Sequence, residues 1–196
     1  MELKYSTLMN KLEEAYSLEI SILKFLLDPK KENFYSLVNL LKNLKFIKTK
    51  PLSLDSNKSI YVSYIDLEED HILFIMYEKR IDFFIGNLLL YIGIILNKIQ
   101  LYLINLYNSC FSFCSYLKNI IDKLEDYKQK AFEISIRINE DVDYVSIYEN
   151  RYEVLDKYKD YPYFDSLIKN SLSNHSKYIN DIISLLKEFQ INIFLY

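Results

Sequence analysis

"FFIGNLLLYIGIIL" (residues 83–96) is a nearly uninterrupted apolar stretch that contains both glycines of the chain, Gly86 and Gly93. A stretch of this kind either crosses a membrane or forms the buried axis of a helical bundle. The two possibilities lead to different fold classes and to different functions. The residues that follow the stretch distinguish between them.

The flanking sequence favours a buried helix over a membrane span. No charge occurs between Asp82 and Lys98, or again between Lys98 and Lys118. The first of these segments has only about 15 residues, whereas a span needs about 20. The second segment contains several amides and serines. Lys98 would lie near the centre of any longer span, at a free-energy cost of about 2.5–3.5 kcal/mol. We therefore expect a bundle, with membrane association as a less favoured alternative.

Beyond this stretch, apolar residues recur every three or four positions, as they do on one face of a helix. The series is Ile81, Ile85, Leu88, Ile92, Ile95, Ile99, Leu103, Leu106, Cys110, Phe113, Leu117, Ile120, Leu124, Tyr127, Ala131, Ile134 and Ile138. An unbroken helix from 81 to 137 would be roughly 85 Å long, which is a rod and not a globule. We therefore expect at least one turn, at NLYNSC (105–110) within the series or at RINEDVD (137–143) beyond it.

The scarcity of turn-forming residues predicts an all-α protein. The chain has two glycines and three prolines, against average frequencies of roughly 7% and 5%, and sheet proteins need these residues in their tight turns. Amphipathic patterns predict further helices at 2–27 and at 30–46. A strongly charged helix is expected at 141–159, and one helix or a broken pair after Pro162. The predicted fold is one domain over residues 1–196, an elongated bundle of roughly five to seven helices around a long central apolar helix.

Two neighbouring segments depart from the helical pattern. IKTKPLSLDSNKS (47–59) carries Pro51 and a polar cluster, which predicts a flexible loop. IYVSYIDLEEDHILFIMYE (60–78) is compatible with two structures. We favour extended chain followed by a helix that begins at Asp66, because a lone two-stranded hairpin is only marginally stable. A small β-hairpin at 60–78 is the alternative.

The two glycines predict a contact between helices. Gly86 and Gly93 are seven residues apart, so on a helix they share one face. Each lowers helix stability by about 1 kcal/mol relative to alanine. The close approach of another backbone is the expected compensation. We predict that this face is a crossing point with a neighbouring helix.

Sequence motifs for catalysis are missing. A glycine-rich phosphate loop cannot be built from two glycines, and no GxSxG, CxxC or HExxH occurs. Cys110 and Cys114 have no further metal ligands close by, so we interpret them as buried thiols. His71 and His175 are the only histidines, and the sequence pairs neither of them with an acid. We expect no catalytic residue, no metal site and no cofactor.

Two features are candidates for binding a partner, although a solvated helix face and intramolecular packing explain the same patterns. The first, which we call the basic shoulder, could contact phosphates; it consists of Lys42, Lys45, Lys48, Lys50 and Lys58. The second is the tyrosine-rich segment 144–165, since tyrosine is enriched at protein interfaces. Its candidate contact residues are Tyr148, Tyr152, Tyr158, Tyr161 and Tyr163.

Two short stretches resemble known families. KNSLSNH (169–175) is similar to the nuclease motif of HEPN domains, which lies near the end of a four-helix bundle. This resemblance implies a degenerate RNase site with Lys169, Asn170 and His175, in which lysine stands where the family has arginine. FIGNLLLYIG (84–93) is similar in layout to the apoptosis-regulator bundles of the B-cell lymphoma type, without the tryptophan and arginine that flank the family's glycine. That resemblance implies a groove for a partner helix.

The leading interpretation is a non-enzymatic helical protein that binds another macromolecule, in the first place a protein. A homodimer through the apolar series, in the manner of a coiled coil, is a second expectation. The alternative is nucleic-acid binding through the basic shoulder, with or without nuclease activity. The start of the chain lacks the apolar region of a signal peptide, so we expect a cytoplasmic protein. Richness in Ile, Lys, Asn and Tyr without Trp is typical of an AT-biased genome, such as that of a virus or mobile element.

Overall fold

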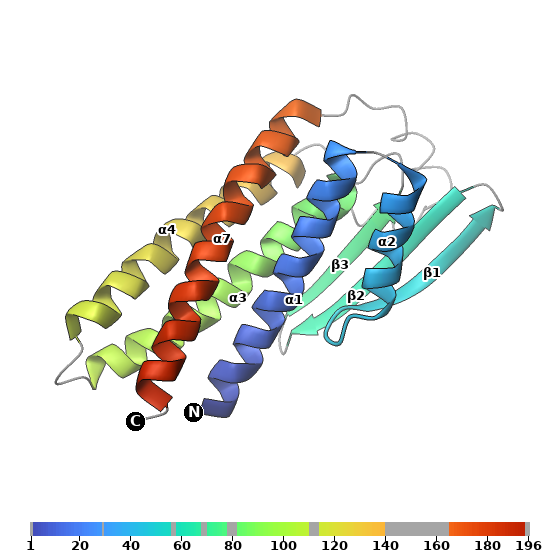
Figure 1. Ribbon diagram of the computed structural model, residues 1–196. Coiled ribbons are helices and arrows are strands. Elements are labelled where there is room, and N and C mark those ends of the chain that lie inside the picture. Colours follow the sequence, from blue (N-terminus) through green and yellow to red (C-terminus); the bar gives the residue numbers. More distant parts are fainter. Residues whose placement is uncertain are drawn as a thin grey trace.

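The computed structural model describes a bundle of long helices beside a small sheet (Figure 1). The described residues are 2–28, 30–55, 58–67, 70–77, 82–109, 114–139 and 165–194. The long helices are α1 (Glu2–Leu27), α3 (Asp82–Asn108), α4 (Cys114–Asn139) and α7 (Asp165–Phe194). α1 and α4 each pack against both α3 and α7, so the four helices form a closed ring around one core.

The predicted helical bundle around the apolar stretch is confirmed. The predicted helix at 2–27 has the bounds of α1, and the predicted turn at 105–110 contains the end of α3 at Asn108. The shorter helix α2 (Lys31–Lys42) packs beside α1 and ends four residues before the predicted 46. The helix predicted at 141–159 lies outside the described residues. A single helix, α7, follows Pro162.

Helix α3 supplies the centre of the core. Its buried apolar residues are Ile85, Leu88, Leu89, Tyr91, Ile92, Ile95, Leu96, Ile99, Tyr102 and Leu103. Burying each such side chain contributes about 1.5–3 kcal/mol to folding. Residues Ile85–Asn108 are long and apolar enough to cross a membrane, but 67% of their apolar 18-residue window is buried inside the protein. α1, α4 and β3 cover the helix, which is why it can be apolar on nearly all sides.

The first and last helices of the described chain lie side by side. The Tyr5 hydroxyl on α1 donates a hydrogen bond of 2.8 Å to the carbonyl oxygen of Leu186 on α7. The Tyr5 ring also packs on Phe189, with ring centroids 5.9 Å apart. At the surface, Lys187 pairs with Glu13 at 2.8 Å. These contacts join segments that are far apart in sequence and bring both ends of the chain to one end of the bundle (Figure 1).

A three-stranded antiparallel sheet in the order β1-β2-β3 lies beside α3 and α2 (Figure 1). Its strands are β1 (Lys48–Asp55), β2 (Lys58–Leu67) and β3 (Asp70–Tyr77). The β2–β3 register runs from the pair Ile60–Tyr77 to the pair Leu67–Asp70. β3 packs against α3, and β1 contacts α2. The all-α class therefore describes the bundle and its core, to which this sheet is added.

The predictions for residues 47–78 need correction. The loop expected at 47–59 is mostly strand, because β1 and the start of β2 occupy it, and the helix expected from Asp66 is wrong. The alternative β-hairpin at 60–78 corresponds to β2 and β3. A third strand and a supporting helix supply the stability that a lone hairpin lacks. Pro51, which favoured a loop, lies on the edge strand β1, where a missing backbone N–H is tolerated.

One carboxylate fixes the chain between α2 and β1. Glu14 on α1 accepts hydrogen bonds from the backbone N–H groups of Lys45 at 2.7 Å, Phe46 at 3.0 Å and Ile47 at 3.0 Å. Ile47 is buried in the core beside it. Three charge-assisted bonds to consecutive donors hold the start of the sheet against the bundle.

Candidate functional site

An ionisable pair lies in the interior of the bundle, between its first and last helices. His175 Nδ1 on α7 is 2.6 Å from Glu19 Oε1 on α1, and both side chains are 0% exposed. Glu19 shares the buried face of α1 with Ala15, Ile22 and Leu26. The bundle could fill this space with apolar side chains, because replacing a buried ion pair in that way is often neutral or stabilising. The pair is therefore not explained by packing alone.

Each member of the pair keeps one unused polar atom. Among the described residues, neither Glu19 Oε2 nor His175 Nε2 has a hydrogen-bond partner, although both atoms are buried. Buried polar atoms nearly always have a partner, and leaving one without costs about 1–3 kcal/mol. Unused buried atoms of this kind point to a ligand, an ordered water or a strained functional group.

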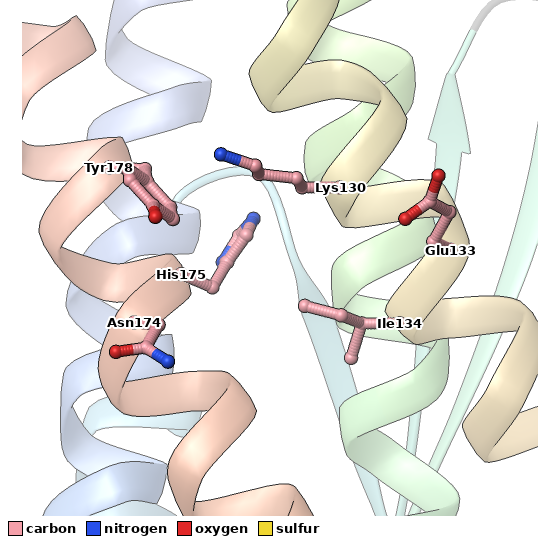
Figure 2. A pocket seen from close by; sticks show the side chains of 6 residues that line it. All are labelled: Lys130, Glu133, Ile134, Asn174, His175 and Tyr178. Atoms are coloured by element: carbon pink, nitrogen blue, oxygen red, sulfur yellow. The ribbon is translucent and has the colours of Figure 1, made fainter.

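A pocket of about 200 Å³ adjoins the pair on the side of α4. Its lining residues come from two helices: Lys130, Glu133 and Ile134 from α4, and Asn174, His175 and Tyr178 from α7. Figure 2 shows the His175 ring extending from α7 into the space between the two helices. The Tyr178 and Lys130 side chains lie at one end of this space, and Asn174 and Ile134 lie toward the other. His175 thus connects the buried Glu19 to a pocket on the bundle surface.

Lys130 and Tyr178 make a contact between α4 and α7 at the pocket. Lys130 Nζ lies 3.8 Å from the centre of the Tyr178 ring, and that ring stacks on Tyr127 with centroids 5.4 Å apart. Asp126 pairs with Lys130 at 3.0 Å. The hydrogen bond that Lys130 donates to this carboxylate raises the pKa of Lys130 above its usual value. Burial raises the pKa of the Tyr127 phenol. Lys130 therefore supplies a cation whose charge is partly offset by its neighbour.

The charge balance of the buried pair determines what His175 Nε2 can do. Two forms of the pair carry no net charge: an imidazolium beside a carboxylate, and a neutral imidazole that accepts the hydrogen of a protonated Glu19. In both forms Nε2 carries a hydrogen, because in the second form Nδ1 is the acceptor. A neutral ring with its hydrogen on Nδ1 would leave a net negative charge buried, at a cost of several kcal/mol. In either charge-balanced form, His175 Nε2 is therefore a hydrogen-bond donor.

A second polar cluster joins α3 to α4 on another face. Lys128 Nζ lies 2.7 Å from Glu125 Oε2 and donates to Gln100 Oε1 at 2.8 Å. Gln100 Nε2 in turn donates to Glu125 Oε2 at 2.8 Å, which closes the cluster. These bonds, led by the one from Lys128, lower the pKa of Glu125 to about 2. Since the polar atoms of Gln100 and Lys128 are paired with one another, this cluster has a structural role.

The basic shoulder does not form one helix face. Lys42 ends α2 and Lys45 follows it, and both are exposed. Lys48 and Lys50 belong to β1 and Lys58 to β2, in the region predicted as a loop. Lys45 Nζ lies 5.3 Å from the centre of the Phe46 ring. Lys11 of α1 lies 5.6 Å from the same ring, and the sequence did not indicate this neighbour.

Cys110 lies outside the described residues, and Cys114 begins α4. Tyr148, Tyr152, Tyr158, Tyr161 and Tyr163 all lie outside the described residues. Within the described ranges, no group of three His, Cys, Asp or Glu residues is placed to hold a metal ion.

Both glycines of α3 meet α4, but through side chains. The Ser135 hydroxyl donates a hydrogen bond of 2.7 Å to the carbonyl oxygen of Gly86. A Cβ atom added at Gly93 would lie 2.5 Å from Cε1 of Phe132. Gly93 therefore makes room for an aromatic ring, where the sequence led us to expect a second backbone. The two glycines mark two contacts between α4 and the apolar helix.

The sequence analysis missed Glu19 and assigned no partner to His175. The two residues are 156 positions apart, so no local pattern connects them. One signal was available: Glu19 is an acid on the apolar face of the predicted helix 2–27, between Ala15 and Ile22. An acid at such a position requires a buried partner. His175 has the same character on the apolar face of α7, between Leu172 and Ile179.

Comparisons with known proteins add no assignment, because no protein-family model, curated protein or solved structure matches this chain. The site is therefore interpreted from its own geometry.

Proposed function

We propose that this chain is a non-enzymatic helical protein that binds another protein, and that the pocket between α4 and α7 is part of its contact surface. The observation that carries the proposal is the His175 Nε2 atom, which is buried and has no hydrogen-bond partner among the described residues, on a side chain that lines a pocket. This pocket is where the described structure leaves a polar group for something else to bind.

The geometry supports binding better than catalysis. A general base must present a lone pair to the proton that it removes. In both charge-balanced forms of the pair, Nε2 carries a hydrogen and cannot accept one. The nuclease function implied by the likeness to HEPN domains would need a form of the pair in which Nε2 carries no hydrogen.

A protein partner is favoured over nucleic acid by the charges on this surface. Lys130 is held by Asp126, and Glu133 lines the same pocket. A polyanion would meet these two carboxylates together with the one cation. Nucleic-acid sites instead gather many cations with few acids. A protein surface, with single charges set among apolar groups, suits this mixed pocket better.

Site-specific photo-crosslinking in extract of the source organism tests the proposal. A benzoyl-phenylalanine placed at the exposed residue Asn174, beside His175, is expected to give one discrete adduct that protease removes. The matched control is the same group at Asn39, an exposed asparagine on α2. Equal labelling from both positions would overturn the proposed contact surface. An adduct that nuclease removes would replace the protein partner with nucleic acid.

A further inference from the structure

We infer that the pocket takes a single carboxylate group presented by an acidic segment of the partner protein, with His175 Nε2–H as its buried hydrogen-bond donor and Lys130 as its counter-ion. This inference rests on the proposed function and names what the pocket recognises. It uses two groups at the pocket: the buried His175 Nε2, which has no hydrogen-bond partner among the described residues, and the Lys130 ammonium, which Asp126 partly offsets.

The donor selects an oxygen acceptor. Because Glu19 occupies Nδ1 at 2.6 Å, the imidazole ring is held in one orientation. Its Nε2–H can then be satisfied by an incoming oxygen, which removes the penalty of an unused buried donor. Glu19 acts here as a positioning residue and does not touch the ligand. An apolar or cationic group would leave the Nε2–H unsatisfied, so the pocket discriminates against both.

The size and charge of the pocket select a carboxylate over a phosphate. A volume of about 200 Å³ holds one small group and not an extended chain. Among the described lining residues, Lys130 is the one lysine or arginine, and Asp126 offsets part of its charge. Glu133 lines the same pocket and repels further negative charge. A group with one negative charge therefore fits better than a phosphate dianion. Ile134 and the Tyr178 ring provide apolar contact for the methylene groups of an acidic side chain.

The chain itself offers a direct spectroscopic test, because it contains only two histidines, His71 and His175. In full-length protein labelled with ¹⁵N-histidine, the variant His71→Gln leaves the His175 ring as the one labelled ring. Titration with acetate, and with the peptide acetyl-Ala-Glu-Ala-amide, is expected to shift the His175 Nε2 signal to saturation. Inorganic phosphate and a short RNA are the comparison ligands. No shift with acetate or peptide, or tighter binding of phosphate or RNA, would overturn the inference.

Variants distinguish a loss of binding at the pocket from a loss of folding. Lys130→Ala is expected to weaken acetate binding about three- to fivefold, the size expected for one partly exposed ion pair. Lys118→Ala removes an exposed lysine of the same helix and is expected to leave binding unchanged. The double variant Glu19→Leu/His175→Phe removes the buried donor without leaving a lone charge. We expect it to fold and to lose binding, as followed by the backbone amide signals of Lys130 and Tyr178. Retained binding in this double variant would also overturn the inference.

The proposed protein contact surface and the proposed carboxylate ligand can be rejected independently of each other. A protein adduct at position 174 together with no response to carboxylates would leave the contact surface in place and reject the carboxylate. A His175 response to acetate without any adduct would reject the partner protein and identify the pocket as a site for a free small carboxylate, which overturns the acidic segment as its source.

Discussion

Both carboxylate oxygens of Glu14 accept a hydrogen bond from the same backbone N–H group, that of Phe46, at 3.0 and 3.1 Å. The two residues come from different parts of the fold, since Glu14 lies on α1 and Phe46 lies just before β1. The neighbouring N–H groups of Lys45 and Ile47 bond to the same carboxylate. A side chain of the bundle thus organises the chain that leads into the sheet.

Removing this carboxylate is expected to loosen the sheet from the bundle. Glu14→Ala leaves three N–H groups without their acceptor, and we expect a loss of about 2–3 kcal/mol in the free energy of unfolding. Urea denaturation followed by circular dichroism measures it. Glu13→Ala is the control, because among the described residues the Glu13 side chain makes a surface pair with Lys187 alone, and its loss should cost less than about 1 kcal/mol. Equal losses for the two variants would contradict the role of Glu14.

Gly93→Ala is expected to destabilise the bundle even though alanine favours helix by about 1 kcal/mol. The added Cβ would meet the Phe132 ring at 2.5 Å, so the ring must move. We expect a net loss of about 1–3 kcal/mol, the usual size for overpacking, measured as a lower melting temperature. Phe132→Leu in the Gly93→Ala background should recover part of that loss. A single variant that is as stable as the wild type would show that the ring moves freely.

The buried pair of Glu19 and His175 predicts that the single variants lose much more stability than the double variant. Glu19→Leu or His175→Phe alone leaves a buried polar partner without its bond, and we expect losses of about 3–5 kcal/mol. The double variant Glu19→Leu/His175→Phe removes both groups, and it is expected to be as stable as the wild type or more stable. Urea denaturation of the wild type, the two single variants and the double variant gives the unfolding free energies of a double-mutant cycle. Additive losses in the double variant would mean that the two side chains do not act as a pair.

The lowered pKa of Glu125 predicts that the protein loses stability in acid. Its pKa is lowered to about 2 in the folded protein from an ordinary value of 4.5, chiefly by the Lys128 hydrogen bond. A lowered folded pKa gives stability that is present above pH 4.5 and is lost as the pH falls from 4.5 toward 2. Because the Glu125 side chain is 48% exposed, we expect no more than about 1 kcal/mol.

The variant Glu125→Gln measures this contribution, through urea denaturation at about pH 7 and about pH 3. The wild type should exceed the variant in stability at the higher pH and approach it at the lower one. In a Lys128→Met background the largest cause of the shift is removed, so the difference between the two pH values should shrink. A difference that stays constant across the two pH values would contradict the assignment.

The sequence predicted the helices well because their pattern is local. The apolar face of residues 2–27 and the stripe that includes Ile92, Ile95 and Ile99 follow the helical period directly, and all of these stripe residues are buried. The strand at Lys48–Asp55 was missed because its lysines and Pro51 have the composition of a loop. Strand pairing, unlike helix periodicity, depends on neighbours that the local sequence does not contain.

The candidate site could be predicted only in part. His175 was singled out by its resemblance to a motif, but its partner Glu19 depends on α1 lying against α7. Periodicity shows which face of each helix is buried and does not show which helices are neighbours. Lys130 had no distinguishing feature in the sequence, since its importance comes from sharing a pocket with residues of another helix.

The contact between α1 and α7 has a consequence for folding during synthesis. Tyr5 bonds to a carbonyl 181 residues later, and α1 packs more extensively on α7 than on α2, the helix that follows it. Most of the chain must therefore leave the ribosome before the apolar face of α1 can be covered completely, and until then that face is open to aggregation. We expect nascent chains without α7 to depend on chaperones, with the bundle closing only after the last helix has been made.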